Sequence, residues 1–183
     1  MTGFTDETSS HEQNPGPLDS DFFMKKGSSF MSSSFALQDQ LPEGHPARVC
    51  FGCGADNEQG LQIKSYMQGD TVVCRFRPQA HHTAFPGVLN GGIAASLLDC
   101  HGIWTAVGYF NTHHLPSDVH APETMFVTKK MTVEYLKPTP MDTELVLQGR
   151  IVEEKTRSMR VEVELWAGQE VTVKAEVIAV RAS

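Results

Sequence analysis

The chain has 183 residues, 40% of them hydrophobic and 20% charged, and its formal net charge at pH 7 is −7. This length and composition fit one globular domain plus a tail and argue against two full domains. No apolar run is long enough to span a membrane, and the acidic N-terminus lacks the basic start and apolar core of a secretory signal. We therefore expect a cytoplasmic protein that binds neither nucleic acid nor membranes.

Residues 1–46 carry seven acidic and two basic side chains and are rich in Ser and Gly. This composition is typical of an acidic N-terminal tail that is partly disordered. Only the stretch SFALQDQLPEGHP, in which Phe35, Leu37 and Leu41 recur at loosely helical spacing, predicts one short helix. The globular domain is expected to span residues 47–183.

The segment GLQIKSYMQGDTVVCRFRP predicts a β-hairpin. Leu61 and Ile63 lie in the first expected strand, and residues 71–76 form the second. The Gly-Asp pair at 69–70 supplies turn residues between them, and a proline ends the second strand.

The next stretch, residues 78–117, contains only one Asp, Glu, Lys or Arg, which is Asp99. Asn90 can cap a helix that begins at Gly91, and apolar side chains then cover nearly every face of that helix. A helix that is apolar all round is buried, so it needs a sheet that wraps around it. The polar stretch YFNTHHLPSDVHAPET that follows predicts a loop.

After this loop the hydrophobic period changes to two, which is typical of strands with one buried face. Four strands are predicted, within residues 125–138, 144–154, 157–166 and 170–182. In the last two of these strands, the face expected to be buried carries Val161, Val163, Leu165, Val171, Val173, Ala175 and Val177. The face expected to be exposed to solvent, or wet face, carries Glu162, Glu164, Thr172, Lys174 and Glu176. We therefore predict an α+β fold, an antiparallel sheet of about six strands wrapped around one long central helix.

This order of elements resembles that of the hotdog-fold thioesterases, as do three stretches: CFGCGADNEQGL before the first strand, FPGVLNGGIAASLLD at the helix and MTVEYLKPTP on the third strand. The resemblance covers roughly residues 48–181 and points to the branch of the phenylacetate-pathway and 4-hydroxybenzoyl-CoA enzymes. It implies hydrolysis of a small-to-medium or aromatic acyl-CoA. No cofactor is implied, because coenzyme A is part of the substrate.

The resemblance also implies roles for single residues. In that family the backbone amide matching Gly91 polarises the thioester carbonyl, and the carboxylate matching Asp99 is the nucleophile or general base. Asn90 stands where many relatives have a histidine, and its amide can donate a hydrogen bond but cannot titrate. This departure keeps a second function open, that of a non-catalytic acyl-CoA-binding or regulatory protein.

The spacing of these residues predicts how subunits assemble. Gly91 and Asp99 lie eight residues apart, which is about 12 Å along a helix axis. One carbonyl cannot contact both, so a shared thioester requires the two groups to come from different subunits with antiparallel helices. We expect a homodimer with two shared sites, which the family further assembles as a dimer of dimers. The alternative is a purely structural role, in which Asp99 reaches solvent or bonds a hydroxyl.

Further candidates lie around the helix start. Gly92 lets a substrate carbonyl approach free backbone amides at the positive end of the helix dipole. Ser96 lies one turn before Asp99, where it orients the carboxylate or bonds its own helix backbone. His82 precedes the helix and either lines the site entrance or belongs to a surface turn. Trp104 and Phe110 are candidates for the far end of the acyl pocket.

Three groups of residues look like other kinds of site but are not expected to form one. Cys100 and His101 are consecutive, and consecutive helical side chains diverge by about 100°, so they cannot form a catalytic dyad with each other. His101 is expected to be a satisfied core or interface histidine. Cys50 and Cys53 form half of a zinc motif, but the other half is missing, and Cys74 and Cys100 stand isolated in the sequence. The loop cluster of His113, His114, Asp118 and His120 is an equally weak metal signal, because adjacent loop histidines are usually solvated. We therefore expect free thiols and no metal site.

Overall fold

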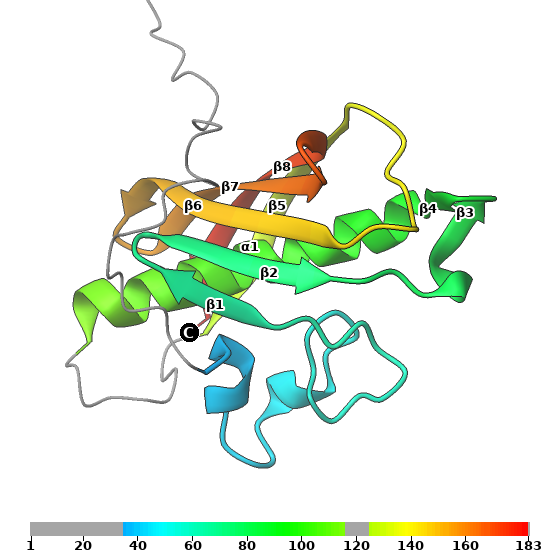
Figure 1. Cartoon of the computed structure of the whole chain (residues 1–183). Helices are drawn as coiled ribbons and strands as arrows, with labels where there is room; N and C mark the ends of the chain where they lie inside the picture. Colours follow the sequence, from blue (N-terminus) through cyan, green and yellow to red (C-terminus); the bar gives the residue numbers. More distant parts are fainter. Residues whose placement is uncertain (1–34, 116–124, 183) are drawn as a thin grey trace, which may run out of the picture.

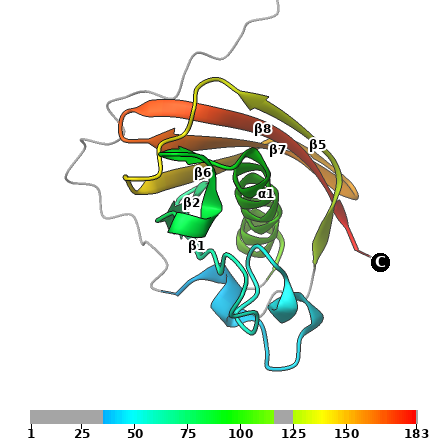
Figure 2. The same ribbon diagram turned by 90° about the vertical axis from the view of Figure 1, so that its right-hand side faces the viewer.

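The protein, seen in a computed structural model, is described over residues 35–115 and 125–182. One long helix, α1 (Gly91–His114), lies against a six-stranded antiparallel sheet. The strands are β1 (Ser65–Gln68), β2 (Thr71–Phe76), β5 (Phe126–Tyr135), β6 (Leu145–Lys155), β7 (Ser158–Ala167) and β8 (Glu170–Arg181), in the spatial order β1-β2-β6-β7-β8-β5. The sheet curves around the helix, so the predicted α+β hotdog architecture is confirmed (Figures 1 and 2).

The first hairpin has the predicted turn, but its first strand begins later than expected. Gln68 pairs with Thr71, and Gly69 between them has a φ of 60°, which favours glycine. Leu61 and Ile63 are buried but do not belong to a strand. Their amides bond to carbonyls of the 51–52 loop at 2.7 and 3.1 Å, because the chain here follows that loop rather than a sheet neighbour.

Two short elements precede the helix. A two-stranded hairpin of β3 (Thr83–Phe85) and β4 (Val88–Leu89) follows the 3-10 helix η4 (Ala80–His82) and leads directly into α1. The helix starts as predicted, with the Asn90 side-chain oxygen accepting the backbone N–H groups of Gly92 and Ile93 at 2.8 and 3.3 Å.

The helix approaches the sheet so closely that small residues are needed at the contact. A Cβ atom on Gly149 of β6 would lie 2.1 Å from Oγ1 of Thr105 on α1. A Cβ atom on Gly102 of α1 would likewise lie 2.8 Å from the Val177 side chain on β8. These glycines let the helix axis come nearer to the sheet than larger residues would allow.

The helix is also longer than the sequence predicts. The expected loop begins at Tyr109, whereas α1 continues to His114. Ring pairs one turn apart stabilise this extension: Tyr109 lies 4.2 Å from His113, and Phe110 lies 4.8 Å from His114, between ring centroids. The His114 ring also contacts the Glu154 carboxylate of β6 at 2.7 Å. The prediction was wrong because the contact with Glu154 depends on tertiary structure, and the polar composition of the stretch concealed the local ring pairs.

The alternation of faces on β7 and β8 is confirmed except at the start of β8, where Val171, expected to be buried, is half-buried and Thr172 is buried. Val161, Val163 and Leu165 are buried, and so are Val173, Ala175 and Val177. Thr172, expected on the wet face, is buried because the pairing of β7 and β8 shifts register between Leu165 and Trp166. Its hydroxyl donates to the Leu165 carbonyl at 3.3 Å and accepts from Thr139 at 2.8 Å.

The segment from residue 35 to residue 64 covers the side of α1 that the sheet leaves open (Figure 2). It contains two 3-10 helices, η2 (Leu37–Gln40) and η3 (Pro46–Val49), where the sequence predicts one helix. Leu37 and Leu41 belong to the hydrophobic core, so part of the expected tail packs onto the domain. Among the described residues, no helix is both long and apolar enough to cross a membrane.

Candidate active site

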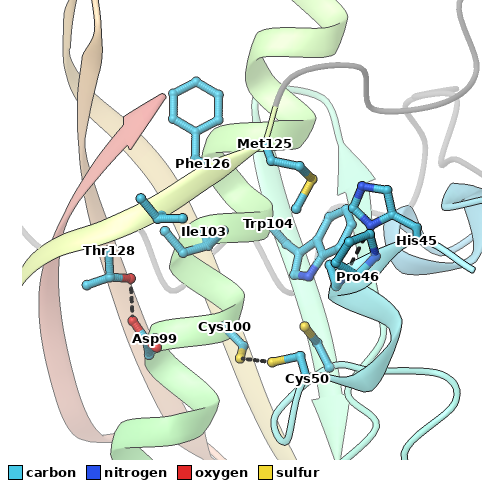
Figure 3. A pocket seen from close by; sticks show the side chains of 13 residues that line it. His45, Pro46, Cys50, Asp99, Cys100, Ile103, Trp104, Met125, Phe126 and Thr128 are labelled. Carbon is cyan, nitrogen blue, oxygen red and sulfur yellow. Dashed lines mark hydrogen bonds between the residues drawn. The ribbon is translucent and has the colours of Figure 1, made fainter. Parts of the chain in front are cut away.

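Asp99 lies at the edge of a pocket of about 520 Å³. The pocket is enclosed by α1, the start of β5 and the segment that contains η3 and the Cys50–Cys53 turn (Figure 3). Ile103, Trp104, Met125 and Phe126 give it apolar walls. One carboxylate therefore faces a mainly apolar space, which is the usual composition of a small-molecule site.

A side chain that the sequence analysis did not single out holds this carboxylate. The Thr128 hydroxyl on β5 donates to Oδ1 of Asp99 at 2.5 Å (Figure 3). The bond occupies one lone pair of one oxygen and leaves the other oxygen available to a water molecule or a substrate. Asp99 is half-buried and Thr128 exposed.

Thr128 points toward the helix because it lies on the inner face of the sheet. It follows the buried Phe126 by two residues and pairs with the buried Ala179 of β8. The pairing of β5 with β8 shifts register only after Thr128, between Thr128 and Lys130. The period-two pattern gives the face of Thr128 but not its neighbour on α1, which is why Thr128 was missed.

The helix start offers hydrogen-bond donors at the other end of the proposed site. The Asn90 oxygen is used as the helix cap, so its amide nitrogen is the group left to donate. The Gly91 carbonyl accepts from the Tyr135 hydroxyl at 2.8 Å. Within the part of the chain that the structure describes, the Gly91 N–H has no acceptor. It therefore remains free for a ligand at the positive end of the helix dipole.

Two other predicted site residues are engaged in the helix backbone. The Gly92 N–H is held by the Asn90 side chain, although Gly92 itself is exposed. The Ser96 hydroxyl donates to the Gly92 carbonyl at 2.9 Å, which is the second of the two roles that the sequence allowed. In this chain it is Thr128 that bonds the Asp99 carboxylate.

His82 lies at the entry to the helix and is only 5% exposed. Its Nδ1 accepts the Gln79 N–H at 3.1 Å, and its carbonyl accepts the Asn90 N–H at 2.8 Å. Its ring stacks on Phe76 with 5.5 Å between centroids. Burial, followed by the neighbouring His81, lowers the pKa of His82. In the described chain His82 is thus bound into the segment before α1 and does not line the pocket.

His101 is the satisfied core histidine that the sequence predicts. It is fully buried, with Nδ1 2.9 Å from the Ser65 hydroxyl and Nε2 3.0 Å from the Val72 carbonyl. The carbonyl accepts, so Nε2 carries the hydrogen, and Nδ1 then accepts from Ser65. Gln38 completes the network by bonding to both the hydroxyl and the amide of Ser65. Burial lowers the pKa of His101 to about 4.

Cys100 lies beside the Cys50–Cys53 turn, although the sequence leaves it isolated. The sulfurs of Cys50 and Cys100 are 3.7 Å apart, and the three sulfurs of Cys50, Cys53 and Cys100 all lie within 4.8 Å of one another. Hydrogen bonds from the Cys100 and Cys53 thiols lower the pKa of Cys50, whereas the pKa of Cys100 is raised by its bond to Cys50. The four described cysteines are free thiols, as expected.

The expected histidine cluster is only partly described. His113 and His114 lie in the last turn of α1 and contact Asp70 and Glu154, at 3.4 and 2.7 Å. Asp118 and His120 lie outside the described residues. Histidines near a helix C-terminus also interact favourably with the helix dipole.

The chain is similar to one known protein family and to several solved structures. The sequence model of the Thioesterase superfamily matches residues 86–174, which include α1 and Asp99. None of the curated proteins matches the chain. A thioesterase superfamily protein from Shewanella loihica PV-4 is 35% identical, with a TM-score of 0.52, and the match covers 66% of this chain and 91% of that one.

Two more distant structures share the fold. The PaaI protein of E. coli, from the phenylacetic acid degradation operon, is 14% identical with a TM-score of 0.56, over 67% of this chain and 81% of that one. The protein smu.793 of Streptococcus mutans, solved bound to acetyl CoA, is 15% identical with a TM-score of 0.54, over 66% of this chain and 89% of that one.

Proposed function

The chain belongs to the thioesterase superfamily, and on this premise we propose that it hydrolyses acyl-CoA thioesters with Asp99 as nucleophile or general base. The observation that carries the proposal is the position of Asp99. Its carboxylate is the acidic group of a mainly apolar pocket and is held there by Thr128. An oriented carboxylate in a pocket that excludes water from its walls suits attack on a bound acyl group.

The catalytic step follows from these groups. As general base, Asp99 takes a proton from a water molecule whose oxygen attacks the thioester carbonyl carbon. The negative charge moves to the carbonyl oxygen, where a backbone N–H stabilises it. The carbon–sulfur bond then breaks, and the thiolate of coenzyme A takes the proton. As nucleophile, Asp99 forms the new carbon–oxygen bond itself, and the carbon–sulfur bond breaks to release the thiolate of coenzyme A. Water then hydrolyses the mixed anhydride, which frees the acid and the Asp99 carboxylate, and the thiolate takes the proton that water gives up.

The carbonyl-polarising group comes, in this proposal, from Gly91 of a second subunit. Gly91 and Asp99 of one chain are separated by two turns of α1, and the Gly91 N–H has no acceptor among the described residues. The edge strand β5 supports such a dimer, because it has a sheet neighbour on one side only and exposes Val127 and Tyr135. A second copy that covers this edge in an antiparallel arrangement places each helix start beside the other helix.

The pocket supports a small-to-medium or aromatic acyl group. Trp104, one of the two residues expected to limit the acyl chain, lines the pocket and is 2% exposed. Phe110 lies behind the pocket wall, 5.8 Å from the Phe126 ring. Aromatic walls of this kind favour flat or short apolar groups. The acetyl CoA bound to the Streptococcus mutans protein is consistent with an acyl-CoA ligand for this fold.

The second candidate function is acyl-CoA binding without hydrolysis. It is favoured by Asn90, which cannot transfer a proton and whose side-chain oxygen is used as the helix cap. Release of free thiol from short, medium and aromatic acyl-CoAs distinguishes the two functions. Turnover of at least one acyl-CoA supports the thioesterase. Tight binding of acyl-CoA with no thiol released supports the binding protein instead.

A further inference from the structure

The turn from Cys50 to Cys53 is packed directly against α1 at Cys100. A Cβ atom on Gly52 would lie 2.3 Å from the Cys100 sulfur, so only glycine allows this approach. The sequence analysis expected no metal site because a second pair of ligands was not visible. The fold supplies a third sulfur from the central helix.

The distances between these sulfurs fit ligands around one ion. Tetrahedral zinc with Zn–S bonds of about 2.3 Å separates its sulfurs by about 3.8 Å. The Cys50 and Cys100 sulfurs are 3.7 Å apart, and all three sulfurs lie within 4.8 Å of one another. A disulfide instead requires about 2.05 Å between two sulfurs and leaves the third without a role.

The shape of the turn gives a second, independent indication. The backbone N–H groups of Gly52 and Cys53 lie on the side of the Cys50 sulfur and lower the pKa of its thiol. The Gly54 N–H donates to the Cys50 carbonyl at 2.9 Å, and a Cβ atom on Gly54 would lie 2.5 Å from the Cys50 nitrogen. Amides directed at a sulfur stabilise its thiolate, the form that binds metals.

The charge of the surroundings also favours a cation. Three neighbouring thiolates repel one another unless positive charge neutralises them. Among the residues that the structure describes, no Lys or Arg lines the pocket that these sulfurs border. A divalent ion supplies the missing charge and lets all three sulfurs ionise together.

We propose that Cys50, Cys53 and Cys100 bind one zinc ion through three thiolates. The fourth position faces the pocket and is taken by a solvent molecule. Thiolate ligands select soft or borderline ions such as zinc over magnesium or calcium. The ion ties the segment before β1 to α1, one residue beyond Asp99, and so fixes the wall of the pocket that this segment forms.

The test uses the full chain, purified with reductant and stripped of metal, and titrated with Co²⁺ as a spectroscopic substitute for zinc. We expect one equivalent of Co²⁺ to bind, with thiolate-to-cobalt charge-transfer absorption and the visible bands of tetrahedral cobalt, and one equivalent of Zn²⁺ to displace it. Cys50→Ser, Cys53→Ser and Cys100→Ser should each weaken binding at least 10-fold. Cys74→Ser is the matched control, because Cys74 is a buried cysteine of β2 whose sulfur bonds the Arg75 carbonyl.

A measurement on the unmodified chain guards against variants that fail to fold. With Zn²⁺ bound, Cys50, Cys53 and Cys100 should resist alkylation, and a chelator should restore the rate at which they are alkylated. The proposal is overturned if the reduced wild-type chain binds no Co²⁺, if the cobalt spectrum survives in Cys100→Ser, or if the three thiols alkylate equally fast with and without Zn²⁺. A disulfide between two of the three in the protein as purified, with no bound zinc, overturns it as well.

Discussion

Thr128 on β5 and Asp99 on α1 are joined by a 2.5 Å hydrogen bond in which the hydroxyl donates to the carboxylate. The bond links the edge strand of the sheet to the central helix at the mouth of the pocket. It gives the carboxylate one fixed orientation, which a half-buried aspartate on a helix would otherwise lack. The proposed chemistry depends on that orientation.

Replacing Thr128 by Val keeps the shape of the side chain and removes the hydroxyl. A hydrogen bond to a charged group contributes about 1.5–3 kcal/mol, so we expect kcat to fall about 10- to 100-fold. KM should change little, since Thr128 acts through Asp99. Steady-state kinetics check this, and Thr128→Ser should recover most of the activity. Equal kinetics for Thr128→Val and wild type would contradict a positioning role.

The Gly91 N–H can be removed without breaking the helix. Gly91 is the first helical residue, where proline is tolerated, and Asn90 before it is already extended, with φ −64° and ψ 132°. We expect Gly91→Pro to lower kcat about 100- to 1000-fold, as loss of an oxyanion donor does. Gly91→Ala keeps the N–H and serves as the control. Activity of Gly91→Pro equal to that of Gly91→Ala would remove this amide from the mechanism.

The shared site makes a separate prediction about mixed dimers. A dimer of one Asp99→Asn chain and one Gly91→Pro chain contains one site with both groups intact. Refolding the two inactive variants together in equal amounts should therefore restore about a quarter of wild-type activity, because half of the dimers are mixed and one of their two sites works. Activity no higher than the sum of the separate variants would contradict sites shared between subunits.

His101 should make stability depend on pH. Its pKa is about 4 in the folded chain, below the ordinary value of 6.5, so the unfolded chain binds the proton more tightly. The stabilisation is fully present above pH 6.5 and is lost as pH falls to about 4. The total loss in the free energy of unfolding over this range is about 3 kcal/mol. Denaturant unfolding of wild type and His101→Gln from pH 8 to pH 4 tests this. The difference between their free energies of unfolding should change over that window, and a constant difference would refute it.

The close contact of helix and sheet at Gly149 should be sensitive to one methyl group. Its Cβ would lie 2.1 Å from Oγ1 and 3.1 Å from Cβ of Thr105. We expect Gly149→Ala to lower the free energy of unfolding by about 1–3 kcal/mol, as overpacking does. A double-mutant cycle with Thr105→Ala, measured in urea, should show that the two changes are coupled. If the effects of the two substitutions were strictly additive, the loss of stability would not come from the contact between these residues.

Much of the fold is predictable from local patterns. The cap at Asn90, the apolar circumference of the helix and the period-two strands each depend on residues close together in sequence. The end of α1 is not predictable in this way, because the contact of His114 with Glu154 exists only once β6 is in place.

The candidate site likewise contains one residue that is predictable from sequence and others that depend on tertiary structure. Asp99 stands out in sequence as the one carboxylate of an uncharged stretch. The contact of Thr128 with Asp99 depends on where β5 lies beside α1, and the approach of Cys100 to Cys50 depends on the path of a loop. Neither follows from spacing along the chain, since both are set by packing over the whole domain.

Thiol release from acyl-CoA by the Asp99→Asn variant tests the central claim most directly. The asparagine keeps the size of the side chain and cannot act as base or nucleophile. The account predicts that kcat falls at least about 100-fold while the affinity for acyl-CoA, measured by calorimetry, is kept. Asp70→Asn, at the exposed β1–β2 turn, should match wild type. Undiminished thiol release by Asp99→Asn would contradict the account.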